Sequence, residues 1–122
     1  MNISPTDVSV VAASAVCGCF ATAVAFNAVT GKPVFVIAGN WRKYLWSIVF
    51  ALPALVIFKL NMPLALTLLI LVGWLIVVPS VAAKLVFGPK DAAWPFLFML
   101  HSAYAFTTLA GILLLNRALG IG

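Results

Sequence analysis

Acidic residues are almost absent from this chain of 122 residues, which contains two aspartates and no glutamate. Charged residues together make up 7% of the sequence, whereas 66% of the residues are hydrophobic and the mean hydropathy is +1.24. Soluble domains carry about 25% charged residues. The composition therefore indicates that water is not the main solvent, and we expect an all-α integral membrane protein with no soluble domain.

A concentrated cluster of basic residues is also lacking. The seven Lys and Arg residues give a net charge of +5, but they are scattered between apolar segments. A protein that binds nucleic acid gathers such charges on one face or along one helix. We therefore expect no nucleic-acid partner, and a lipid bilayer as the surroundings of the chain.

Cysteine is scarce as well, and its spacing is unfavourable for a shared site. Cys17 and Cys19 are two residues apart in an apolar segment, so a helix would turn them about 200° away from each other. Thiolates suit soft metal ions, which raises the hypothesis of metal transport. This spacing favours the simpler interpretation that both cysteines act as small hydrophobic residues.

Four apolar segments are each close to the length of about 20 residues that a helix needs to cross a bilayer. They are residues 7–29, 44–60, 64–87 and 95–116, and they predict a four-helix bundle formed by one membrane domain over residues 1–122. The connections "TGKPVFVIAGNWRK", "KLNMP" and "FGPKDAAW" contain turn-forming and charged residues. Pro53 and Pro79 interrupt the second and third segments, where we expect kinks.

The N-terminal segment raises the alternative of a secretory signal, because "AVA" at residues 23–25 resembles a cleavage site. However, the leading "MNISPTD" contains no Lys or Arg, and the apolar run of about 20 residues is longer than a usual signal core. We therefore expect this segment to be part of the mature protein.

The distribution of basic residues predicts an orientation. If both termini lie outside, five basic residues face the cytoplasm and two face outward. Aromatic residues that favour the headgroup layer fall at the same cytoplasmic side, namely Trp41, Tyr44, Trp46 and Trp94. We therefore expect a bacterial inner membrane or its organellar equivalent, with both termini on the non-cytoplasmic side.

The first segment contains small residues at a spacing of four, in the row Ser14, Gly18 and Thr22. A second such row consists of Ala15, Cys19 and Ala23. Small side chains at this spacing let helix backbones approach closely when lipid supplies no hydrophobic driving force. We therefore expect the first row to press against another helix.

Histidine occurs once, in the apolar stretch "WPFLFMLHSAYAF". His101 shares one face of the fourth segment with Tyr104, Thr108 and Gly111. An imidazole at such a position could be the axial ligand of a haem iron or of the magnesium of a chlorophyll-type pigment. A hydrogen bond across helices is the interpretation we favour, because no second histidine exists for a bis-imidazole haem. The sequence requires no cofactor.

In outline, four short spans in a small chain resemble the small multidrug resistance transporters. Members of that family carry a membrane-embedded glutamate in the first span. Here the first span has no carboxylate beyond Asp7 at its edge. The resemblance is therefore limited to the outline and does not extend to the functional residue.

No nucleophile with a base, carboxylate pair or glycine-rich phosphate loop is found in the sequence, so we do not expect an enzyme. The favoured expectation is a small accessory subunit of a larger membrane complex, of a respiratory, photosynthetic or secretory kind, that packs against neighbouring helices. A small homo-oligomeric transporter or channel is the first alternative, since four helices line a pathway by pairing with further copies. A membrane pilin or secretion-system component is the second.

Overall fold

The computed structural model describes residues 4–31, 41–87 and 93–118, and every element in these ranges is a helix. Three helices are long: α1 (Pro5–Thr30), α5 (Leu64–Ala82) and α6 (Trp94–Ala118). Between α1 and α5 lie α3 (Trp41–Ala51), α4 (Pro53–Ile57) and the 3-10 helix η1 (Phe58–Leu60), and α5 continues into the π-helical η2 (Ala83–Phe87). Each predicted segment falls within these helices, which confirms the all-helical fold.

Helix α1 has well-defined caps at both ends. The Ser4 hydroxyl accepts a hydrogen bond from the Asp7 amide (3.1 Å), and the Asp7 carboxylate accepts one from the Ser4 amide (3.0 Å). This capping box satisfies amides that the first turn leaves without partners. At the other end Gly31 adopts a φ of 73°, and its amide donates to the Asn27 carbonyl (2.8 Å). A residue without a Cβ atom takes this conformation at little cost.

The second apolar segment is broken where its proline predicted a kink. Helix α3 ends at Ala51 and α4 begins at Pro53, which has no amide hydrogen to continue the ladder. The segment then tightens into η1 and turns at Asn61, whose φ of 57° is left-handed. Asparagine tolerates this conformation better than most residues. By contrast, α5 runs through Pro79 as far as Ala82.

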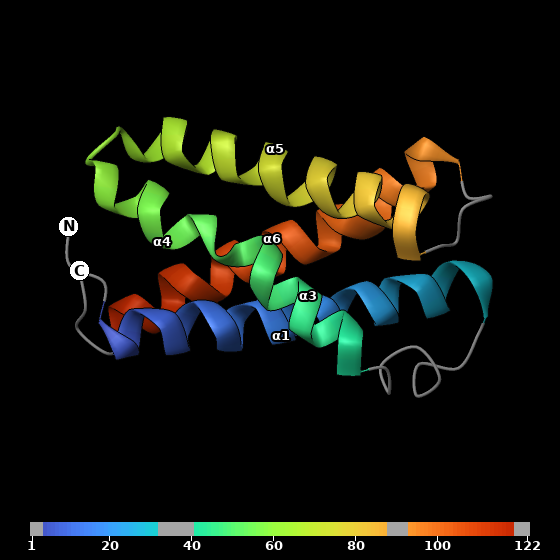
Figure 1. The fold of residues 1–122 in the computed structure, drawn as a ribbon, viewed down its shortest axis with the longest axis horizontal. Coiled ribbons are helices and arrows are strands. Elements are labelled where there is room, and N and C mark those ends of the chain that lie inside the picture. Colours follow the sequence, from blue (N-terminus) through green and yellow to red (C-terminus); the bar gives the residue numbers. More distant parts are fainter. Residues whose placement is uncertain (1–3, 32–40, 88–92, 119–122) are drawn as a thin grey trace.

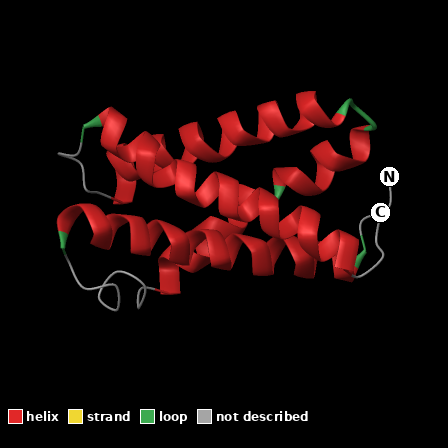
Figure 2. Ribbon diagram, turned by 180° about the vertical axis from the view of Figure 1, so that it is seen from behind, coloured by secondary structure: helices red, strands yellow, loops and turns green. Residues whose placement is uncertain are grey.

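The long helices pack in an antiparallel arrangement in which the first and the last lie side by side. Helices α1 and α6 share the most extensive contact, α5 packs on the same α6, and α3 crosses over α1 (Figure 1). Seen from behind, the described residues are again helical apart from a few short loop positions (Figure 2). The start of α1 and the end of α6 therefore lie at one end of the molecule.

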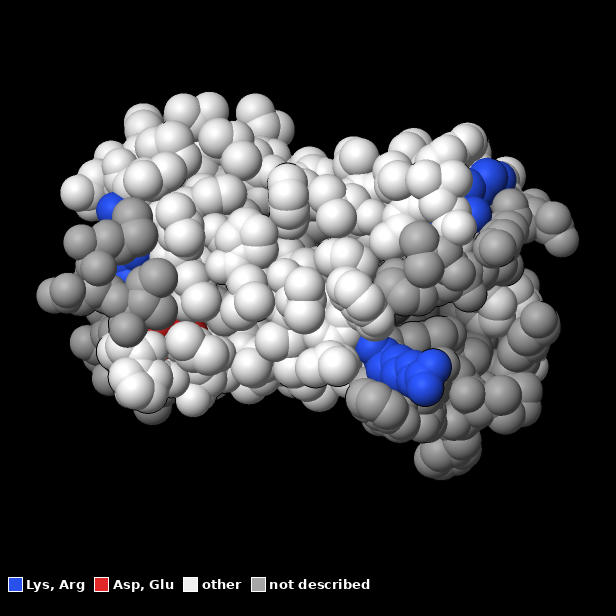
Figure 3. All heavy atoms as spheres, viewed as in Figure 1, with Lys and Arg blue, Asp and Glu red and all other residues white. Residues whose placement is uncertain are grey.

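The interior is apolar where α1, α3, α5 and α6 meet, and it includes the fully buried Leu71, Leu75 and Ala105. The outward surface is apolar as well, since Leu69 is 71% exposed, Leu114 67% and Phe106 61%. Three helices are long and apolar enough to cross a membrane, and the helical stretch Tyr44–Leu60 is shorter. Charged side chains gather at the two ends of the face in Figure 3, with an uncharged middle between them.

Candidate functional site

Helices α1 and α6 approach each other closely where they cross. A Cβ atom added at Gly18 would overlap Thr108 Oγ1 and would lie 2.9 Å from the Tyr104 carbonyl oxygen. A Cβ atom added at Gly111 would lie 2.8 Å from Ser14 Oγ. The structure thus brings together five of the residues that the small and polar rows predicted. The helix against which the first small row presses is therefore α6 of the same chain.

This crossing has a reciprocal geometry, because each helix places a glycine opposite a hydroxyl of the other. Ser14 is 1% exposed and Thr108 is 0% exposed. Within the described ranges neither Ser14 Oγ nor Thr108 Oγ1 has a hydrogen-bond partner. Each oxygen instead lies against a glycine of the opposite helix, in space that any Cβ atom there would occupy. The hydroxyls therefore serve as close-packing groups.

The remaining members of the two small rows lie beside this crossing. Thr22 is half-buried, and its hydroxyl donates back to the Gly18 carbonyl of its own helix (3.0 Å). Ala15 and Ala23 are buried, whereas Cys19 is half-buried. Cys17 lies on the exposed side of α1. Within the described ranges no three His, Cys, Asp or Glu side chains gather into a group that could hold a metal ion.

Tyr104 joins α6 to a third helix. Its side chain is buried at 3% exposure, and its hydroxyl donates to the Ser47 carbonyl of α3. The Ser47 hydroxyl in turn donates to the Tyr44 carbonyl (2.6 Å). Tyr104 packs one ring edge against Gly18 of α1 and donates from its hydroxyl to α3. It therefore holds α1, α3 and α6 together.

His101 is half-buried and contacts Ser80 of α5. Its Nδ1 atom lies 2.9 Å from the hydroxyl oxygen of Ser80, a residue with no exposed surface. The same hydroxyl donates its single hydrogen to the Ile76 carbonyl (2.6 Å). The tautomer of the imidazole decides which of the two side chains donates in this contact, and the ring also has a hydrogen bond with the Leu97 backbone of its own helix.

Trp74 supplies another link between helices, from α5 to α3. Its indole N–H donates to the Phe50 carbonyl (3.0 Å), directly before the break at Pro53. A tryptophan in the middle of an apolar segment needs a partner for its N–H. The sequence does not identify a backbone carbonyl of α3 as that partner, because the acceptor becomes accessible only where the helix ladder is interrupted.

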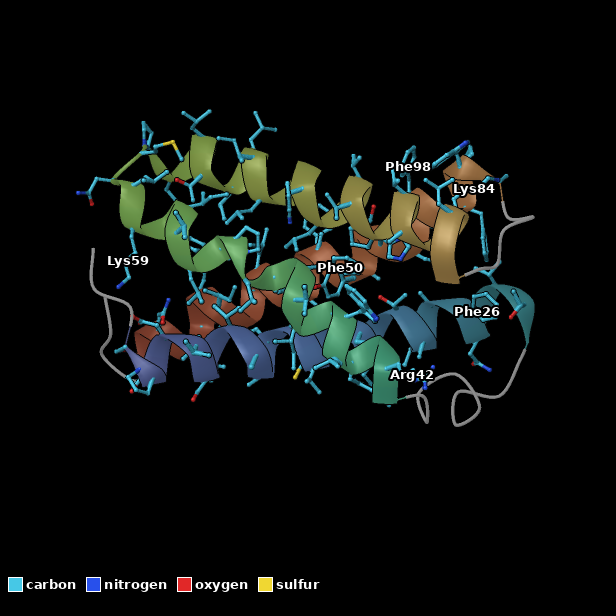
Figure 4. All side chains as sticks on the ribbon, viewed as in Figure 1. Phe26, Arg42, Phe50, Lys59, Lys84 and Phe98 are labelled. Carbon is cyan, nitrogen blue, oxygen red and sulfur yellow. The ribbon has the colours of Figure 1, made fainter. Side chains whose placement is uncertain are left out.

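The charged side chains of the described ranges lie toward the ends of the bundle. Lys59 Nζ is 3.3 Å from an Asp7 carboxylate oxygen, which ties η1 to the start of α1. Toward the other end, Lys84 Nζ lies 5.5 Å from the centre of the Trp94 ring. Figure 4 places Lys59 at one end, and Arg42 and Lys84 toward the opposite end. The ion pair joins residues far apart in sequence, and only the antiparallel order of the spans could have indicated it.

Comparisons with models of protein families, with curated proteins and with solved structures find no match to this chain.

Proposed function

We propose that the chain is an integral membrane protein whose four apolar segments all cross the bilayer. The outward apolar side chains support this, because water would disfavour Leu69, Phe106 and Leu114 at their exposures of 61–71%. The second crossing is the helical stretch Tyr44–Leu60 of α3, α4 and η1, which is shorter than the others and reaches about 25 Å at 1.5 Å per residue. A break within it is tolerated because Trp74 satisfies a carbonyl beside the break.

The orientation in this proposal places the end with Arg42 and Lys84 in the cytoplasm. The opposite end holds the Asp7–Lys59 ion pair, in which the two charges offset each other. Both termini are then on the non-cytoplasmic side, in a bacterial inner membrane or its organellar equivalent. The five-to-two distribution of basic residues in the sequence supports the same orientation.

We further propose that the protein is an accessory subunit that packs against other integral-membrane chains. Two features support this role. The polar side chains of Tyr104, Trp74 and Ser80 bond one helix to the next, as a rigid packing module requires. On the outer side of α1, small side chains at a spacing of four are exposed, namely Ser9, Ala13 and Cys17.

The outer side of α1 is the observation that carries the proposal. The inner small row is already occupied by α6, so a foreign helix has to approach elsewhere. Between the exposed Val16 and Phe20 on the same side, the small residues leave gaps into which a neighbouring helix could pack, whereas α5 exposes mainly large apolar side chains such as Leu69. We therefore expect the outer side of α1 to face a subunit, and that of α5 to face lipid.

Purification in a mild detergent tests this proposal. We expect different subunits at fixed stoichiometry, and we expect Ala13→Leu to reduce their recovery by interrupting the small surface. Gly73→Leu is the matched control, because Gly73 is exposed on α5 with no atom near its added Cβ. A defined homo-oligomer would instead support the transporter or channel. Purification as a monomer without any other protein would contradict both the subunit role and the transporter or channel role.

A further inference from the structure

Lys84 and two aromatic residues of α6 form a continuous series of contacts at one end of the bundle. The Lys84 ammonium group lies 5.5 Å from the centre of the Trp94 ring, and the ring centres of Trp94 and Phe98 are 5.8 Å apart. The two aromatic residues are one turn apart on α6, whereas Lys84 belongs to η2. Figure 4 shows both Lys84 and Phe98 at this end. A charged group therefore continues directly into an aromatic surface.

This surface is accessible from outside the bundle. Trp94 is 40% exposed and Phe98 is 37% exposed, while Lys84 is half-buried. Next to Lys84 in sequence, Leu85 is 67% exposed, and Val81 in the preceding turn is 38% exposed. The end of α5, η2 and the start of α6 thus present exposed apolar side chains together with one ammonium group.

The net charge at this end favours a negatively charged partner. Indole carries no net charge, so its contact positions the Lys84 ammonium group without neutralising it. In the proposed orientation, five of the seven basic residues lie on this side together with one of the two aspartates, Asp91, which leaves a net charge of +4. The other aspartate, Asp7, pairs with Lys59 at the opposite end. An anion is therefore attracted to the end that contains Lys84.

An anionic phospholipid matches both properties of this surface. Its phosphate accepts charge-assisted hydrogen bonds from an ammonium group, and its acyl chains pack against exposed apolar side chains. Indole rings favour the headgroup layer, where such a phosphate lies. A free phosphate or an acidic peptide would match the charge and leave the apolar side chains uncovered.

We propose that Lys84, Trp94 and Phe98 bind an anionic phospholipid, with its phosphate at the Lys84 ammonium group and an acyl chain along the two rings. The proposal rests on the proposed crossing of the bilayer and does not require the subunit role. Anionic lipids are enriched in the cytoplasmic leaflet, the side on which the proposed orientation places this end.

The experiment measures lipid selection by the purified full-length chain in a nonionic detergent. Mixed micelles contain equal amounts of phosphatidylglycerol and phosphatidylcholine with the same acyl chains, and native mass spectrometry counts the lipids that stay bound. We expect wild type to retain phosphatidylglycerol over phosphatidylcholine at about five to one, the effect of one basic residue near a membrane surface. Added salt should lower this ratio because it screens the charge.

Matched variants separate this surface from the overall charge. Lys84→Gln should lower the ratio about fivefold, whereas Lys84→Arg should retain it because the charge remains. Lys59→Gln removes the same charge at the opposite end and should leave the ratio unchanged. Trp94→Leu keeps every charge and should lower the ratio about twofold, because no indole positions the ammonium group. Circular dichroism checks that each variant remains helical.

Each outcome distinguishes lipid selection from the membrane crossing on which it rests. Equal retention of the two lipids by wild type would overturn the proposal and leave the crossing intact, whereas retention of neither lipid would contradict both. An equal loss of preference in Lys84→Gln and Lys59→Gln would show that the overall charge selects the lipid, and this would also overturn the proposal.

Discussion

Gly18→Ala adds a single methyl group where α1 and α6 are in close contact. The new Cβ would overlap Thr108 Oγ1 and lie 2.9 Å from the backbone oxygen and from one ring carbon of Tyr104. Thr108 has no exposed surface, and a carbonyl oxygen cannot rotate away on its own. The methyl group can therefore be accommodated only if α6 moves away from α1.

Two opposing effects set the magnitude. Replacing glycine by alanine inside a helix favours folding by about 1 kcal/mol, whereas overpacking a well-filled contact costs about 1–3 kcal/mol. Separation of the helices also lessens the packing contacts along the rest of this crossing, which adds to the cost. We expect Gly18→Ala to lower the free energy of unfolding by about 1–3 kcal/mol, because the steric effects exceed the gain in helix propensity.

The assay is unfolding in mixed micelles as the fraction of denaturing detergent rises, followed by circular dichroism. Gly73→Ala supplies the control, because the same change on α5 meets no atom within 4 Å and should leave stability unchanged or slightly increased. The double variant Gly18→Ala with Thr108→Ala should recover part of the loss, since the overlapping oxygen is gone. Equal stability of Gly18→Ala and Gly73→Ala would refute the reasoning.

Three further outcomes are expected. Tyr104→Phe should lower the free energy of unfolding by about 0.6–2 kcal/mol, measured in the same assay, because the bond to the Ser47 carbonyl is lost; an unchanged value would contradict its role between helices. His101→Gln should retain most of the stability because its amide still offers Ser80 a donor, whereas His101→Leu should unfold earlier; equal curves would show that the bond contributes nothing. A reporter that works only outside the cytoplasm should be active when fused after Gly122, because we place the C-terminus outside. A reporter that works only in the cytoplasm should be inactive at the same position. The opposite pattern would reverse the proposed orientation.

The helical architecture could be predicted because length and hydropathy alone mark segments of this kind. The break at Pro53 was also predictable, since proline lacks the amide hydrogen that the ladder needs. The contact partners of individual residues could not be predicted. The spacing of Ser14 and Gly18 indicated a helix contact, but a spacing does not say which helix makes it. Only the folded chain places α6 there.

Long-range polar contacts were the least predictable part of the site. The Lys59 ammonium group pairs with Asp7, a contact between residues of two segments that neither segment indicates by itself. Likewise, the face shared by His101 and Tyr104 divides in the structure, because the tyrosine contacts α1 and α3 while the histidine contacts α5. A helix that packs between two other helices turns different parts of the same face toward them. The spacing of residues along the helix does not show which part contacts which neighbour.

The pairing of the first helix with the last has a consequence for how the protein is made. During synthesis α1 emerges first, whereas its main contact, α6, begins only at Trp94. In the proposed membrane setting, α1 therefore enters the bilayer with Ser14 and Gly18 still facing lipid, and the bundle closes after the final span has been inserted. Closure depends on a contact between distant parts of the chain, so assembly is a late step of biogenesis. A ribosome that stalls before α6 leaves behind an inserted chain whose first helix is open to other small-residue helices.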